Sequence, residues 1–405
     1  MVTSAAAPAP SSRPALSLPP SQFARLQPHA YLLAHLSPPS TNNQPSIRAN
    51  GRAPTQFRVT SANAGSLTHT NGSAVVRIGD TAAVCGVRAE LLHTEDIASW
   101  SVSQATSSNK SPRSVDQTEE LGEQDDNETI ERERAHIEDL NLLVPNLSLS
   151  TGCAPGFIPG SAPSSLAQSL SHQILSLLHS TRLVRADDLR IWYQPPSMGP
   201  EELERHNEEE QMDVDTAQND PVEESPREIK AFWVLYIDIM IISLAGNAFD
   251  AAWAAVLAAL RDTKLPKAWW DVDNETVVCS DSISDARKLS LRGLPVASSF
   301  AVFEADAAAG WRAVVIPEAA EMKAQRLARK GGVSERWLLA DPDGYEEGLT
   351  QERACVVVDK DTDGKVIILE MEKNGGWTID TEDLQQLVDL SSQRWEDMKR
   401  ILDEC

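Results

Sequence analysis

The stretch NGSAVVRIGDTAAVCGVRAE, residues 71–90, decides the fold of this chain. Asn71-Gly72 is the kind of dipeptide that most strongly signals a two-residue hairpin turn, and Gly79-Asp80 marks a second turn inside the apolar run that follows. With the segment FRVTSANAG at 57–65, these two turns predict three antiparallel strands. The first structured part of the chain is therefore β-rich.

A second apolar run, AFWVLYIDIMIISLAGNAF at 231–249, is long enough to suggest a membrane span. Asp238 near its middle would cost about 2.5–3.5 kcal/mol on insertion scales, and Gly246-Asn247 interrupts it. Its β-branched and aromatic composition instead predicts a long strand buried on both faces, and we expect no membrane contact. Asp238 would then be a hydrogen-bonded core carboxylate or a former metal or substrate acid.

Two helices follow from apolar periodicity and capping signals. After the long strand, Asn247 can cap a helix with Asp250 in a capping-box relation. Its apolar stripe comprises Phe249, Trp253, Val256, Leu257 and Leu260. After Pro163, Ser164 or Ser165 can cap a second helix, on which one face carries Leu166, Leu170, Ile174, Leu177 and Leu178.

The remaining elements complete a fold of mixed type. We expect further helices at 317–330 and from about 381, and further strands at 141–150, 188–194, 294–303, 311–316, 354–359 and 365–372. Helices combined with mixed, largely antiparallel sheets predict an α+β fold rather than a doubly wound one.

Negative charge is concentrated in two stretches. The chain has 405 residues and a formal charge of −24, of which residues 116–139 carry −9 and residues 201–228 carry −10, leaving −5 for the other 353 residues. Neither stretch has apolar periodicity, which is typical of solvated, disordered segments. The overall charge therefore excludes a globally basic nucleic-acid binder, but the folded part is nearly neutral.

These patterns predict one domain with additions. Residues 1–22 are expected to be a disordered Pro/Ala/Ser-rich tail, and 23–402 a single domain interrupted by acidic insertions at 101–139 and 196–228. The first acidic residue is Asp80, and the residues before it hold six Arg. Such a bias can mark a mitochondrial transit peptide, but the many prolines would break a presequence helix.

The cysteines and histidines predict no metal site and no cofactor. The five cysteines are far apart without a CxxC pair, and the eight histidines form no HxxH or HExxH pair. A structural zinc site or a disulfide framework is therefore not expected. A reducing compartment, the cytosol or the nucleus, fits best.

Several segments, in chain order, resemble the RNase PH family, whose phosphate-dependent 3′-to-5′ exoribonuclease fold also forms the six-membered ring of the RNA exosome. IRANGRAPTQFR at 47–58 is similar to the family's opening Arg-x-Asp-Gly-Arg followed by acid-x-Arg. Arg48, Gly51, Arg52 and Arg58 match this pattern, whereas Asn50 and Gln56 replace its acids. The hairpin 71–90 looks like the family's Gly-Ser-Ala, Gly-Asp-Thr segment. The resemblance implies an RNase PH-type fold.

The resemblance continues to the end of the chain. Residues 236–266 are similar to the strand and Ala-rich helix that follow the family's active site. Residues 338–376 are similar to its closing Asp-Pro, acidic pair, two strands and Lys-x-Gly-Gly. Coverage is thus about 23–402, with the two insertions excepted.

The segment that resembles the family's active site has lost its chemistry. Active members carry an Asp-Gly-Gly-Thr-Arg type sequence where this chain reads Ala245, Gly246, Asn247 and, further on, Asp250. The helix expected to supply phosphate-binding Arg, 164–182, has no Arg before its end. Phosphorolysis needs phosphate held by Arg or amides and an acid that manages the proton or a metal. We therefore predict a catalytically inactive member of the family, with no catalytic residue.

Four arginines in a segment without acids before Asp80 are candidate binding residues. Arg48, Arg52, Arg58 and Arg77 could contact RNA phosphates or pair with acids of a neighbouring subunit. We favour the subunit interface.

The resemblance implies a non-catalytic structural subunit of the RNA exosome core ring, active in rRNA maturation and RNA turnover in the nucleus, nucleolus and cytoplasm. Its partners would be other RNase PH-type ring subunits, RNA-binding cap proteins, a separate hydrolytic exoribonuclease and single-stranded RNA. Two alternatives stay open. One is an active phosphate-dependent exoribonuclease, and the other is a protein-only adaptor that uses its acidic loops.

Overall fold

The computed structural model describes residues 19–38, 45–98, 100, 137–158, 164–194, 228–305, 336–350, 352–361, 363–375 and 379–405. Most of the predicted tail and both acidic insertions, the strand predicted at 311–316 and the helix predicted at 317–330, with its basic residues, lie outside these ranges. Helix α1 begins at Pro20, inside the segment predicted as tail.

The chain divides into two compact units that interleave along the sequence. Unit 1 comprises residues 1–58, 298–355 and 372–383, and unit 2 comprises residues 59–297, 356–371 and 384–405. The single domain predicted over 23–402 contains residues of both units.

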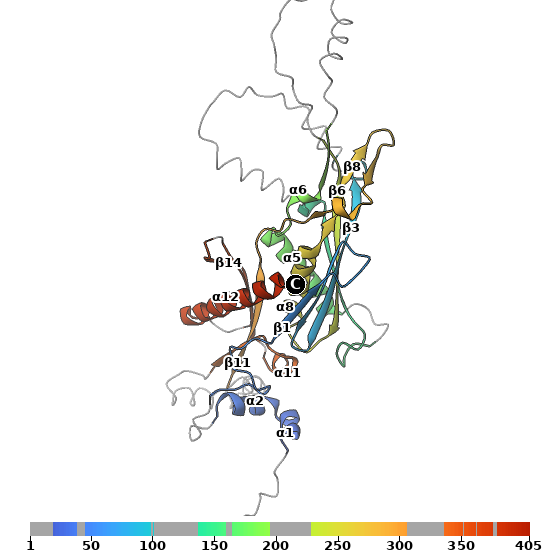
Figure 1. Cartoon of the computed structure of the whole chain (residues 1–405). Helices are drawn as coiled ribbons and strands as arrows, with labels where there is room; N and C mark the ends of the chain where they lie inside the picture. The colour runs from blue at the N-terminus through green and yellow to red at the C-terminus, as the bar shows by residue number, and fades with distance from the viewer. Residues whose placement is uncertain are drawn as a thin grey trace, which may run out of the picture. The chain divides into compact units, whose positions relative to one another are not determined.

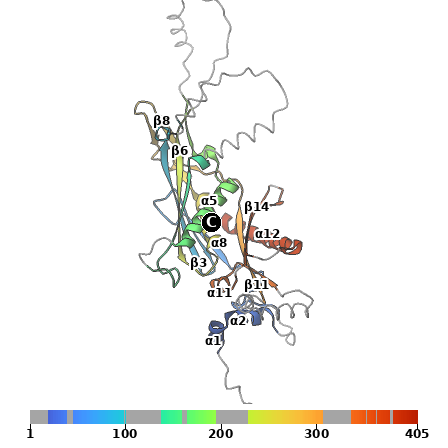
Figure 2. The ribbon, with the colours of Figure 1, turned by 180° about the vertical axis from the view of Figure 1, so that it is seen from behind.

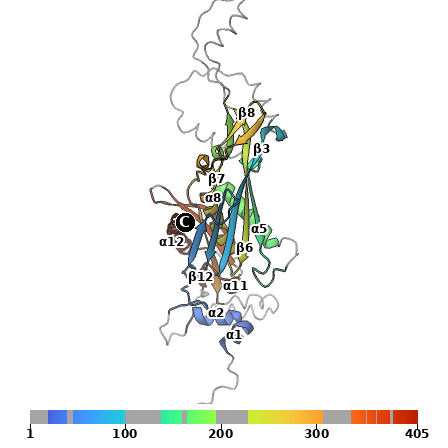
Figure 3. The same cartoon turned by 45° about the vertical axis from the view of Figure 1, so that its right-hand side comes forward.

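Unit 2 is built on a six-stranded sheet (Figure 1). Its strands are β1 (Thr60–Ala64), β2 (Gly72–Ile78), β3 (Thr81–His93), β4 (Leu143–Leu149), β5 (Arg190–Tyr193) and β6 (Glu228–Ser243). The order is β1-β2-β3-β6-β4, with β5 also paired to β6. The three predicted antiparallel strands are confirmed as β1, β2 and β3, and so is the turn at Gly79-Asp80 between β2 and β3. The two-residue turn predicted at Asn71-Gly72 is wrong, because residues 65–71 connect β1 to β2 and Gly72 is the first residue of β2, paired with Val87. Figure 3 shows β3 and β6 side by side, while β4 runs parallel to β6.

Two helices cover one face of this sheet. Helix α8 (Ala248–Asp262) packs on β2 and β3, and α5 (Ser165–Thr181) packs on β4 (Figure 1). Both predicted N-caps are confirmed, since Ser164 accepts a hydrogen bond from Ala167 N and Asn247 accepts one from Asp250 N. All residues from Ala248 to Leu260 are buried, because small alanines let α8 pack closely on every side. On α5 the predicted stripe is buried except for Leu166, which is 39% exposed.

The prediction that the long strand is buried on both faces is confirmed for residues 231–235 and is wrong for the second half of the strand. From Ile237 to Ile242 the side chains of β6 alternate between buried and exposed, as expected when helices cover only one face of a sheet. Asp238 lies on the exposed face, where its carboxylate meets Arg88 Nη2 at 3.5 Å and Asn146 Nδ2 at 3.3 Å. It is therefore not the core carboxylate that the sequence suggested.

Short strand pairs extend unit 2. The pair β7 (Lys264–Leu265) and β10 (Arg287–Lys288) and the hairpin of β8 (Ala268–Asp271) and β9 (Thr276–Cys279) were not predicted. Figure 2 shows β8 at the end of the sheet where β6 begins. There the Lys230 ammonium lies 5.8 Å from the Tyr193 ring and 5.5 Å from the Trp270 ring, distances at which cation–π attraction operates.

The shorter helices of unit 2 connect these elements. They are α6 (Ala186–Leu189) and two 3₁₀ helices, η2 (Thr94–Asp96) and η3 (Ile283–Asp285).

Unit 1 has its own apolar core. It combines α1 (Pro20–Leu26), α2 (Pro28–Leu36), β12 (Arg336–Ala340), α11 (Gly344–Glu347) and part of β11 (Val296–Glu304). The core residues are Leu32, Leu36, Ala301, Phe303 and Leu339. The segment 23–36 thus forms parts of two helices, and Leu32 and Leu36 are buried against residues of β11 and β12.

A four-stranded sheet has the order β12-β11-β13-β14, with β13 at Glu352–Lys360 and β14 at Val366–Asn374. Three of its strands carry residues of both units. The last helix, α12 (Thr381–Asp403), begins where it was predicted. No helix in the described ranges is long and apolar enough to cross a membrane.

Candidate functional site

The segment from Ala245 to Asp250 is fixed by internal hydrogen bonds. Thr81 Oγ1 donates to Gly246 O at 2.7 Å and accepts from Ala245 N at 3.1 Å. Asn247 Nδ2 donates to Asp250 Oδ2 at 2.8 Å, and the two side chains are only 3% and 4% exposed. Asp250 thus completes the cap of α8 from a buried position, which is a structural role for the one acid that this segment retains.

A cavity of about 690 Å³ lies between β4 and the N-terminal half of α5. Its lining is apolar or neutral polar, with Asn146, Ser148, Phe157, Ile158, Gln168 and Ser171 among its members. His172 is the single ionisable side chain among the lining residues that the structure describes. The sequence explains this lack of charge, because residues 140–181 contain no Asp, Glu, Lys or Arg.

The cavity adjoins the segment at Ala245. The loop that follows β4 is bonded to the end of β6, since Leu244 N donates to Cys153 O at 3.0 Å and Ser150 N donates to Ile241 O at 2.9 Å. Burial raises the pKa of the Cys153 thiol, which keeps it uncharged. The loop after β4 therefore lies next to the residues that precede Ala245, and α5 packs on β4.

What this site can bind follows from its lining. A phosphate group is held in proteins by Arg, Lys or several free backbone amides. At the start of α5 the amide of Ala167 is already bonded to Ser164 Oγ at 3.2 Å. The site can accommodate neutral or apolar groups, and it lacks the side chains that stabilise the charge of a transferring phosphoryl group.

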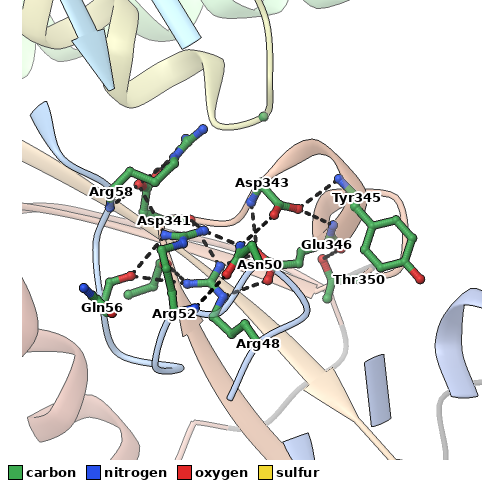
Figure 4. A network of polar contacts seen from close by, with 12 residues as sticks. Arg48, Asn50, Arg52, Gln56, Arg58, Asp341, Asp343, Tyr345, Glu346 and Thr350 are labelled. Atoms are coloured by element: carbon green, nitrogen blue, oxygen red, sulfur yellow. Dashed lines mark hydrogen bonds and ion pairs between the residues drawn. The ribbon is translucent and has the colours of Figure 1, made fainter. Parts of the chain in front are cut away.

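The predicted arginines Arg48, Arg52 and Arg58 come together in unit 1 (Figure 4). Arg48 is 1% exposed and forms a bidentate ion pair with Glu346, with Nε 2.7 Å from Oε1 and Nη2 bonded to Oε2. Its Nη1 also donates to Ala340 O at 2.6 Å. A buried charge is tolerated only with such partners. Arg48 therefore stabilises the fold of unit 1, and none of its N–H donors is exposed.

The other two arginines converge on Asp341. Arg58 is bidentate, with Nε 2.8 Å from Asp341 Oδ2 and Nη2 2.7 Å from Oδ1. Arg52 donates to Asp341 O and to Gln56 O, each at 3.1 Å, and its side chain is 14% exposed. Burial and the nearby Arg48 lower the pKa of Arg52, while Asp341 and Glu346 oppose that shift. Arg52 is the partly accessible member of the cluster.

The acids of this cluster come from the other end of the sequence. Asp341 and Glu346 are fully buried, and Asp343 caps α11 in a capping box with Glu346. Asn50 Nδ2 donates to Asp343 Oδ2 at 2.7 Å. Sequence reasoning recognised both segments by resemblance but did not connect them.

Arg77 is not part of this cluster. It lies in unit 2 on β2, 62% exposed, with Nε donating to Gly79 O at 2.7 Å and Nη2 3.2 Å from Asp80 Oδ1. Contact of the four arginines with RNA or with a neighbouring subunit stays a prediction, since the structure holds one chain. Among the residues described, no three His, Cys, Asp or Glu side chains are grouped to hold a metal ion. None of the five cysteines forms a disulfide within the described residues.

The fold and sequence define the class of this protein. Residues 127–266 match the family described as 3′ exoribonuclease family, domain 1 (RNase_PH). The fold is similar to that of a chain from the "archaeoglobus fulgidus exosome with RNA bound to the active site". The TM-score is 0.51 at 18% identity, over 92% of this chain and 96% of that one. Residues 127–266 are thus similar to an RNase PH domain, and the fold is of the RNase PH type.

Two proteins give the more particular likeness. This chain is 29% identical, over 68% of its length and 72% of the relative's, to the exosome complex component rrp43 of Schizosaccharomyces pombe. It is 24% identical, over 62% of its length and 69% of the relative's, to a putative exosome complex exonuclease RRP42 of Dictyostelium discoideum. A resemblance to the ring subunit called ribosomal RNA-processing protein forty-three is carried by two segments of the sequence, FARLQPHAYLLAHL (23–36) and IRANGR (47–52).

Proposed function

We propose that this chain is a non-catalytic structural subunit of an RNA exosome core ring. The observation that carries the proposal is the cavity between β4 and α5, whose described lining has no ionisable side chain except His172. An RNase PH domain that keeps its fold but offers no cation to phosphate retains a scaffold without the chemistry.

The buried acid near this cavity supports the same conclusion. Asp250 is held by Asn247 in the cap of α8, so the proton-managing acid that phosphorolysis needs is absent from the accessible surface of this segment. In this proposal the chain supports 3′-to-5′ processing and degradation, including rRNA maturation, by forming part of the RNA channel.

The proposed partners follow from the likeness to an exosome complex component. They are other RNase PH-type subunits in a hetero-hexameric ring, RNA-binding cap proteins, a separate hydrolytic exoribonuclease and single-stranded RNA. The proposed location is the nucleus, the nucleolus and the cytoplasm.

Assembly is tested by isolating the tagged full chain from its own cells at moderate salt and measuring the stoichiometry of what co-purifies. Equimolar RNase PH-type subunits are expected. Isolation of the chain with none of them would overturn the ring proposal and favour an adaptor that uses its acidic loops.

Catalysis is tested separately on the purified chain. Single-stranded RNA with a 3′ tail is incubated with and without inorganic phosphate, and released nucleoside diphosphates are quantified. No release above the phosphate-free control is expected. Release that depends on phosphate and persists after removal of trace nucleases would establish an active phosphorolytic exoribonuclease instead.

A further inference from the structure

A second, smaller cavity lies in unit 2, and it shares no lining residue with the cavity between β4 and α5. It has a volume of about 280 Å³, and its lining includes Arg261, Lys288, Leu291, Leu294, Lys399 and Asp403. Three cationic side chains thus surround a space with an apolar floor and a single carboxylate. This volume is close to the ~300 Å³ at which small-molecule pockets begin, so one nucleotide unit or part of one can be accommodated.

The loop that forms one wall is held in place by hydrogen bonds. Leu289 N donates to Thr263 O at 3.2 Å, and Arg292 N donates to Leu183 O at 2.8 Å. Leu294 N donates to Asp359 Oδ2 at 3.0 Å. A wall fixed at three points needs little further ordering when a ligand binds, which favours affinity.

The charges in the cavity are unevenly matched. Arg261 Nη2 lies 2.7 Å from Asp403 Oδ1, so these two charges offset each other. Lys399 Nζ lies 5.0 Å from the ring of Trp395, and Lys288 is exposed on β10. In the described ranges, neither lysine ammonium has a carboxylate within 4.0 Å. Two positive charges are therefore left for an anion.

Helix dipoles explain part of this cluster but not all of it. Arg261 is in the last turn of α8 and Lys399 is near the end of α12, where cations offset the partial negative charge of helix carbonyls. Lys288 is on a strand, and the register of β7 with β10 places it directly opposite Lys264. Like charges at opposed strand positions are destabilising, and a bound anion would relieve that repulsion.

We propose that this cavity binds the phosphoryl group of a nucleotide unit. Lys288 and Lys399 contact the phosphate oxygens, and the leucines contact the sugar or base. A free nucleotide and an RNA phosphate share this chemistry, and the site stands apart from the cavity between β4 and α5.

The test uses the purified full chain and the variant Lys288→Glu/Lys399→Glu. The matched control is Lys267→Glu/Lys365→Glu, because both of these lysines are exposed and neither lines the cavity. The probe is a fluorescein-labelled single-stranded oligouridylate, with adenosine monophosphate and inorganic phosphate as competitors. Thermal unfolding of each variant confirms that it is folded.

Wild type and control are expected to bind the probe equally. The cavity variant is expected to bind at least about tenfold more weakly, which is the loss of one charge-assisted hydrogen bond. Displacement by the monophosphate identifies a nucleotide site, and failure of displacement identifies an internal RNA phosphate as the ligand.

Equal binding by the cavity variant and the control, or no binding of probe and monophosphate by wild type, would overturn the proposal. Co-purification of ring subunits is scored on the same variants. Failure of the ring subunits to co-purify would count against the ring proposal, and the measured RNA binding would still test this cavity.

Discussion

Two regions of this molecule treat charge in opposite ways. In unit 1, Arg48, Arg52 and Arg58 are packed against Asp341 and Glu346, and most of these charges are buried. In unit 2, residues 140–181 have no Asp, Glu, Lys or Arg at all, although they line the larger cavity.

The difference shows which residues of the family pattern have a structural role in this chain. A buried ion-pair cluster is hard to change piece by piece, because losing one partner leaves the other uncompensated. The larger cavity has no such constraint, because its described lining contains no ion pair. The opening arginine pattern is thus retained here as a structural clamp, while the region that resembles an active site has become neutral. The predictions below test that contrast.

The largest expected effect is that of Arg48→Met. It leaves Glu346 buried without its bidentate partner, and we expect a loss of about 3–5 kcal/mol in the free energy of unfolding. Urea unfolding followed by circular dichroism measures this loss. The control is Arg77→Met, which removes an exposed pair with Asp80 and should cost no more than about 1 kcal/mol. Equal losses in the two variants would show that the buried cluster does not clamp unit 1.

A smaller loss of stability is expected from Thr81→Val, beside the segment at Ala245. This change removes the hydroxyl that bonds Gly246 O and Ala245 N, and leaving a buried polar group unsatisfied costs about 1–3 kcal/mol. Thr81→Ser keeps the hydroxyl and should retain most of the stability. Hydrogen exchange of the Ala245 amide is the specific readout. An unchanged exchange rate in the valine variant would mean that other contacts hold this segment.

Sequence reasoning recovered the parts of the fold that are specified locally. The turn at Gly79, the caps Ser164 and Asn247 and the strand β6 each follow from a few adjacent residues. The turn predicted at Gly72 does not form, because Gly72 belongs to β2. It missed the exposed face of β6, because apolar residues such as Met240 and Ile242 occupy that face too. Periodicity cannot separate a doubly buried strand from one with an exposed apolar face.

The candidate site was predicted less completely, for a different reason. The loss of charge near Ala245 and along α5 is visible in the sequence, and the structure bonds the loop that follows β4 to the residues just before Ala245. The burial and pairing of the arginines depend on Asp341 and Glu346, which lie almost three hundred positions away from Arg48 in the sequence. No local pattern gives such a pairing, and only the tertiary structure identifies it.

Substitution of Arg52, the partly accessible member of the charged cluster, should lower the stability less than substitution of the buried Arg48. Arg52→Met removes a guanidinium that lies 3.8 Å and 3.7 Å from its two carboxylates, and it also relieves repulsion from Arg48. We expect a stability loss of about 1 kcal/mol, as for a partly exposed pair. Because the variant remains folded, subunit or RNA binding can be measured on it directly. A loss as large as that of Arg48→Met would show that the cluster has no weaker edge.

The smallest effect on stability is expected when charge is returned to the neutral region. Gln168→Arg/His172→Arg places two cations on exposed positions that line the larger cavity, and stability should stay within about 0.5 kcal/mol. The control Ser169→Arg/Ser176→Arg adds charge to exposed positions of the same helix outside the cavity lining. Filter binding of single-stranded RNA should strengthen more in the cavity variant, with a salt slope steeper by about 0.7 for each new phosphate contact. Phosphorolysis should stay absent, because Asp250 remains buried in its helix cap. Release of nucleoside diphosphates by this variant alone would show that added cations are sufficient for phosphorolysis and that no further acid is needed.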